Sequence, residues 1–206
     1  MNLPPGHIFA GLPARAAGAL LVDPPWRFRT WSETNQAKSP SKHYALMRTE
    51  EIAGLPVAEI AANDAVLFLW ISWPMLPQAM QVIDSWDFVY RTCAFAWIKG
   101  DASQIDMFRD DIVPAMKLGY WTRANSEVCL LATRGDPKRL HADVRQAIVE
   151  PSREHSRKPD CIHDRIERLV AGPYVELFAR STRPRWKAWG TETTKYDTPV
   201  LREAAE

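Results

Sequence analysis

Residues 20–26 read Leu-Leu-Val-Asp-Pro-Pro-Trp, a short apolar run that ends in a carboxylate, two prolines and an aromatic ring. A Pro-Pro pair can continue neither a helix nor a central strand, so the chain must leave the predicted strand in a stiff turn after Asp23. That turn presents the Asp23 carboxylate, the Pro24 carbonyl and the Trp26 ring together. Two acceptors beside a ring suit a flat ligand with an exocyclic amino group. The alternative is a strand that simply ends in a turn.

Length and composition predict one globular domain over 1–206, with a core from about 18 to 190 and short terminal extensions. No apolar run approaches the roughly 20 residues of a membrane span, and the N-terminus lacks the features of a signal peptide. The three cysteines lie far apart without a Cys-x-x-Cys pair, which favours free thiols in a reducing compartment. We therefore expect a cytoplasmic protein with no membrane partner and no metal site.

Charge is distributed unevenly along the chain. The net charge is +1, yet residues 134–187 contain 13 Lys or Arg and 8 Asp or Glu, an excess of five positive charges. Such an excess can be an ordinary solvated face or a surface that contacts phosphates. The composition leaves both interpretations open.

Predicted strands and helices alternate along most of the chain. Apolar runs predict strands at 20–23, 65–71, 88–99, 127–133, 144–149 and 174–180. Proline starts and apolar residues at helical spacing predict helices at 74–86 and 159–171. This alternation indicates an α/β domain with a largely parallel sheet. Residues 27–43 and 100–123 fit neither pattern; their basic and aromatic side chains suit phosphates and stacked bases.

The ordered motifs resemble those of the MT-A70 family, the S-adenosylmethionine-dependent adenine N6-methyltransferases. The resemblance runs from about Leu20 to Gly190, and it rests on many short motifs in the family's order. The principal ones are Asp23-Pro24-Pro25-Trp26, His43-Tyr44, Leu67-Phe68-Leu69-Trp70, Trp97-Ile98-Lys99, Gly119-Tyr120-Trp121, His155-Ser156-Arg157-Lys158-Pro159-Asp160 and Glu176-Leu177-Phe178-Ala179-Arg180.

This resemblance implies a Rossmann-like methyltransferase fold that is circularly permuted, because the Asp-Pro-Pro-Trp strand precedes the strand that carries Glu176. The two strands should be neighbours in the sheet, and ligands of open α/β sheets bind beyond the carboxyl ends of strands. The implied catalytic residues are Asp23, Pro24, Pro25 and Trp26. The implied S-adenosylmethionine site consists of Asp23, Lys158, Glu176, Arg180, Ser181, Thr182, Thr191 and Glu192. The implied substrate contacts are Tyr44, Lys99, Trp121, Asn125 and Glu127.

Several of these residues have a purely structural alternative. Glu176 lies in an apolar strand, where it could form a buried ion pair with an arginine instead of accepting ribose hydroxyls. Lys158 could be a solvated cation at a helix start, although a positive charge is poorly placed there. For Trp70 we expect a place in the core or the cleft wall.

The implied partner is nucleic acid. The chain is compact like bacterial and phage members of the family, which favours DNA over RNA. A non-catalytic subunit of a methyltransferase complex is a further alternative, which the intact Asp-Pro-Pro-Trp motif disfavours. Association into homo- or hetero-oligomers is left open.

Overall fold

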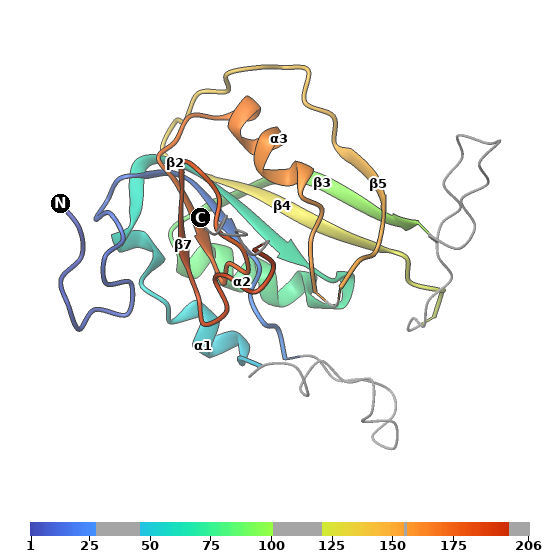
Figure 1. Ribbon diagram of the computed structural model, residues 1–206, viewed down its shortest axis with the longest axis horizontal. Coiled ribbons are helices and arrows are strands. Elements are labelled where there is room, and N and C mark those ends of the chain that lie inside the picture. The colour runs from blue at the N-terminus through green and yellow to red at the C-terminus, as the bar shows by residue number, and fades with distance from the viewer. Residues whose placement is uncertain (28–45, 101–120, 155, 198–206) are drawn as a thin grey trace, which may run out of the picture.

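A seven-stranded sheet forms the centre of the computed structural model, which describes residues 1–27, 46–100, 121–154 and 156–197 (Figure 1). The elements, in chain order, are β1 (Ala17–Val22), α1 (Thr49–Ala53), η3 (Val57–Glu59), β2 (Ala61–Ile71), η4 (Trp73–Met75), α2 (Leu76–Ser85), β3 (Val89–Gly100), β4 (Ser126–Arg134), β5 (Ala147–Pro151), α3 (Cys161–Leu169), β6 (Tyr174–Leu177) and β7 (Trp186–Trp189).

The strand order is β5-β3-β4-β2-β1-β6-β7, and only β4 runs antiparallel to both of its neighbours. The other described pairings are parallel, which confirms the predicted largely parallel sheet. β1 lies between β2 and β6, with Leu21 opposite Glu176. The predicted adjacency of the Asp-Pro-Pro-Trp strand and the Glu176 strand is therefore confirmed.

Both faces of the sheet are covered by helices, α3 on one side and α1 with α2 on the other (Figure 1). Leu20 and Val22 of β1 pack into the core beneath α1 and α2, while Leu21 packs into the core beneath α3. A strand buried on both faces needs apolar residues at every position, which explains the unbroken apolar run before Asp23.

Several predicted element boundaries differ from the structure, and two of the differences involve residues next to the cavities described below. We predicted a strand over 174–180, but β6 ends at Leu177 because Phe178 adopts a left-handed φ of 61°. We predicted a helix from Pro74, but residues 73–75 form a 3₁₀ turn and the α-helix runs from Leu76 to Ser85. The short edge strand β7 was not predicted as a strand.

The N-terminal segment, residues 1–16, is part of the core rather than a loose extension. Phe9 is fully buried, and its ring packs edge-to-face on Trp189 with centroids 4.9 Å apart. Trp189 Nε1 also donates a hydrogen bond to the Ile8 carbonyl at 2.8 Å. The segment therefore packs against the methyltransferase core, whose predicted boundary near residue 18 stays a prediction. No helix within the described ranges is long and apolar enough to span a membrane.

Phe9→Ala should lower the free energy of unfolding by about 3–5 kcal/mol, because it removes a buried aromatic side chain and leaves a cavity. Ile8→Ala is the matched control: the Ile8 side chain is 50% exposed and only its carbonyl binds Trp189. That control should cost about 1 kcal/mol or less. Denaturant titration measures both. Equal losses in the two variants would show that residues 1–16 are not anchored through Phe9.

Candidate active site

Asp23 lies just beyond β1, where it borders three adjoining cavities. The largest has a volume of about 480 Å³ and lies at the carboxyl ends of β1 and β2. Arg180, which follows β6, also lines all three cavities. Adjoining cavities at the carboxyl ends of central strands are where an open α/β sheet binds its ligands.

Backbone and indole hydrogen bonds fix the turn after β1. The Trp26 amide donates to the Pro24 carbonyl at 2.8 Å, and the Met47 amide donates to the Pro25 carbonyl at 2.9 Å. Trp26 Nε1 donates to the Trp70 carbonyl of β2 at 3.0 Å. The predicted stiff turn is therefore tied to its neighbours, and Trp26 lies in the cavity wall with only 6% exposure.

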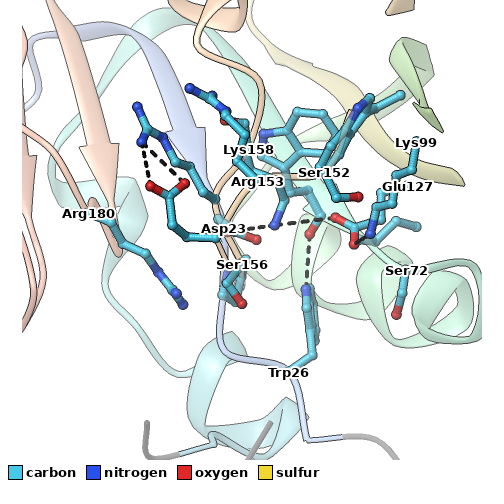
Figure 2. A pocket seen from close by; sticks show the side chains of 16 residues that line it. Asp23, Trp26, Ser72, Lys99, Glu127, Ser152, Arg153, Ser156, Lys158 and Arg180 are labelled. Atoms are coloured by element: carbon cyan, nitrogen blue, oxygen red, sulfur yellow. Dashed lines mark hydrogen bonds and ion pairs between the residues drawn. The ribbon is translucent and has the colours of Figure 1, made fainter. Parts of the chain in front are cut away.

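Four side chains of alternating charge form what we term the charge cluster: Asp23, Lys158, Glu127 and Lys99. Lys158 Nζ donates to Asp23 Oδ2 at 2.8 Å and lies 3.4 Å from Glu127 Oε2 (Figure 2). Lys99 completes the cluster with an ion pair to Glu127 Oε1. The sequence did not predict that these four residues meet, because they come from four separate segments of the chain.

Tryptophan rings line the charge cluster. Lys158 Nζ lies 5.6 Å from the centre of the Trp70 ring, and Lys99 Nζ lies 4.8 Å from the centre of the Trp97 ring. A cation over an indole face is stabilised by the ring's quadrupole. Trp70 is 1% exposed and lines the largest cavity, which confirms its expected place in the core or cleft wall.

The charge cluster shifts the pKa values of its two central members. Burial alone would raise the pKa of Glu127, but the charges and hydrogen bonds of Lys158 and Lys99 outweigh burial and lower it to about 2. Burial would likewise lower the pKa of Lys158, yet the nearby Asp23 and Glu127 raise it above its ordinary value. Glu127 is therefore ionised and Lys158 protonated at neutral pH.

Glu176 is held by a histidine that the sequence did not single out. Its Oε2 lies 2.8 Å from Nε2 of His163 on α3, so the partner is not the arginine considered above. The His163 ring is 8% exposed and packs edge-on against Trp186, with centroids 4.8 Å apart. The available signal was a polar residue beside Ile162 on the apolar face of a predicted helix.

The remaining predicted donor-site residues are divided among the cavities. Ser181 lines the small cavity that Glu176 and His163 border. Thr191 and Glu192 line a third cavity, of about 360 Å³, together with apolar side chains such as Trp189. Thr182 lines none of these three cavities; its hydroxyl donates to Asp197 at 2.8 Å.

The predicted substrate contacts divide in a similar way. Lys99 and Glu127 both line the largest cavity. Asn125 borders them, since its carbonyl accepts a hydrogen bond from the Lys99 amide at 2.7 Å. Trp121 is 92% exposed, and Tyr44 lies outside the described residues.

The excess of positive charge over 134–187 is largely taken up by ion pairs. Most of these cations have an acidic partner in the structure; examples are Arg153 with Asp160, Arg157 with Glu154, Arg168 with Asp143, Arg183 with Asp164 and Arg185 with Glu167. Phosphate contacts from this stretch stay a prediction.

Comparison with known proteins identifies the family: the MT-A70 model matches residues 18–192. The chain belongs to the MT-A70 family. It is 28% identical to the Type II methyltransferase M.MunI of Mycoplasma sp. over 98% of this chain and 90% of that protein. It is 25% identical to the N(6)-adenosine-methyltransferase catalytic subunit METTL3 of Homo sapiens, over 84% of this chain but 27% of that protein. An MT-A70-like relative of Arabidopsis thaliana is 26% identical, with 23% of its length covered.

Family membership confirms the predicted methyltransferase fold and the predicted S-adenosylmethionine cofactor. The chain is thus a member of a family of S-adenosylmethionine-dependent adenine N6-methyltransferases. The match begins at residue 18, so the whole N-terminal segment that anchors Trp189 lies outside it.

The residues at the three cavities fit this donor. The amino-acid end of S-adenosylmethionine carries an ammonium and a carboxylate, so it needs partners of both charges. Asp23 and Lys158 line the cavities and supply one charge of each sign. A ribose needs an acceptor such as Glu176, and a flat purine fits the apolar third cavity beside Trp189. The buried Trp70 Nε1 has no hydrogen-bond partner among the described residues, which leaves one donor for a ligand at the cavity wall.

His163→Ala should raise the dissociation constant for S-adenosylmethionine about tenfold, because Glu176 loses the hydrogen bond that orients it. His163→Gln keeps an N–H donor and should restore much of the affinity. His7 is the matched control, since it pairs with Glu59 at 3.3 Å in the N-terminal segment; His7→Ala should leave donor affinity unchanged. Calorimetry measures the dissociation constant for S-adenosylmethionine in each variant. A normal affinity in His163→Ala would show that Glu176 does not need its hydrogen bond with His163.

Proposed function

We propose that this protein transfers a methyl group from S-adenosylmethionine to the exocyclic N6 amine of adenine in DNA. The observation that carries the proposal is the Asp23 carboxylate, held at the cavity floor by Lys158 in a rigid Asp-Pro-Pro-Trp turn. The near full-length similarity to a Type II methyltransferase supports DNA as the polymer. The relatives named for adenosine support RNA, which is the alternative.

The chemistry follows from the weakness of the nucleophile. The lone pair of the adenine amine is delocalised into the ring, so the amine needs acceptors that favour a more pyramidal nitrogen. Asp23 supplies one acceptor. The Pro24 carbonyl already accepts the Trp26 amide, and its second lone pair remains available for the other. Bound S-adenosylmethionine supplies an electrophilic methyl group on a sulfonium.

Positioning supplies most of the catalysis in such a transfer. Lys158 fixes one oxygen of Asp23, and the second carboxylate oxygen is the one that we assign to the amine. Asp23 need not be a strong base, because the amine proton becomes acidic only as the nitrogen gains positive charge. The proton can then pass to Asp23 and on to water, with no covalent enzyme intermediate.

The target base must leave a duplex to reach this cavity. A base within a stacked duplex cannot approach a carboxylate at a cavity floor, so it is flipped out or is already single-stranded. The wall contributes indole rings, Trp26 and Trp97, and polar groups from the charge cluster. Single-stranded adenines should react at least as readily as paired ones, because no unpairing is required.

A non-catalytic role is the remaining alternative. The proposal makes Asp23 and Lys158 essential, whereas a partner subunit would need neither. Their intact ion pair at the cavity floor favours a working enzyme.

Wild-type protein incubated with donor and separate DNA and RNA pools should form N6-methyladenine in DNA. Asp23→Asn should lower the rate by about 100-fold or more, because it removes the charge but keeps the shape. Nucleoside mass spectrometry measures both, and circular dichroism controls for folding of the variant. Methylation confined to RNA would overturn the choice of polymer. Equal rates in wild type and Asp23→Asn would overturn the assigned role of Asp23.

A further inference from the structure

Trp73 is an exposed tryptophan just beyond the end of β2, outside the lining of the largest cavity. It directly follows Ser72, which lines that cavity at the end of β2 (Figure 2). Its exposed fraction is 52%, whereas the tryptophans within the cavity wall, Trp26, Trp70 and Trp97, are exposed by 6%, 1% and 4%. Trp73 is therefore exposed to solvent, whereas Trp26, Trp70 and Trp97 are buried.

The ring is held in one place. Trp73 Nε1 donates a hydrogen bond to Ser126 Oγ on β4 at 3.1 Å, and Ser126 directly precedes Glu127 of the charge cluster. Pro74 follows at once and stiffens the backbone where η4 begins. A ring that is already immobilised loses little conformational entropy when a ligand packs on it.

A structural role alone does not explain the choice of residue. A link between the ends of β2 and β4 needs only a donor for Ser126, which a smaller polar side chain could supply without exposing an aromatic surface. An exposed indole offers a flat surface on which a base can stack. A link between β2 and β4 therefore does not require a fixed, exposed indole at position 73.

We propose that Trp73 is a stacking platform for the nucleobase next to the target adenine in a DNA strand. The inference rests on the proposed function. When one base enters the cavity beside Asp23, the adjoining base of the same strand must lie at the rim. An indole face there stacks on any base, so the contact adds affinity for an unpaired strand without selecting a sequence.

Binding of fluorescently labelled single-stranded DNA with one adenine, measured by anisotropy in the presence of S-adenosylhomocysteine, tests this role. Trp73→Ala should weaken binding about 5- to 150-fold, the range for loss of one base–aromatic stack. Trp73→Phe keeps a ring and should retain most of the affinity. The matched control is Tyr90→Ala, since Tyr90 is 42% exposed on β3 where it pairs with Ala132, at the far end of the sheet from the cavity.

DNA strands with an abasic residue next to the adenine test whether Trp73 stacks on the base at that position. Wild-type protein should lose affinity for the abasic strands, whereas Trp73→Ala should lose none beyond its own deficit, because the stack is already absent. Donor affinity should be unchanged in Trp73→Ala, which shows that the variant is folded. Normal strand affinity in Trp73→Ala, or a full abasic penalty in that variant, overturns the platform. These outcomes are separate from failure of the proposed function, which would be wild-type protein that forms no N6-methyladenine.

Discussion

The Lys158 ammonium lies between two carboxylates from different segments of the chain, and the organisation of the site depends on this contact. Asp23 follows β1, Glu127 lies in β4, and Lys158 belongs to the segment before α3. Without the cation, two buried carboxylates would share one cavity wall, and like charges in such a place destabilise each other strongly. With it, each carboxylate has a partner and a fixed orientation. With Lys99 of β3, the charge cluster thus joins four segments along the cavity wall.

The sheet topology explains why a single site can hold two ligands. Asp23 directly follows β1, and the parallel neighbour β6 carries Glu176, so the proposed acceptor of the amine and the proposed ribose acceptor lie toward the same edge of the sheet. The Phe178 backbone, at a φ of 61°, ends β6 and directs Arg180 toward all three cavities. The N-terminal segment then supports this edge from outside the family match, through Phe9 and Trp189.

Sequence predicts the strands and the ordered motifs well, because burial on both faces of a parallel sheet demands unbroken apolar runs and proline fixes their ends. It proposes a set of site residues, but it does not predict which of them touch. The contact of Lys158 with Asp23 spans 135 positions, and no local pattern encodes it. His163 was missed because a polar residue beside Ile162 reads as a helix surface position. Trp73 was missed because exposure, not identity, distinguishes it from the buried tryptophans around it.

The most direct test of this organisation is a double-mutant cycle on the methyl-transfer rate with Lys158→Met and Glu127→Gln. If Glu127 acts by holding Lys158, each single variant is slowed and the double variant is no slower than Lys158→Met alone, since the two residues work as one unit. We predict that non-additive result. Losses that multiply in the double variant would contradict it, because Glu127 would then act on the substrate independently of Lys158.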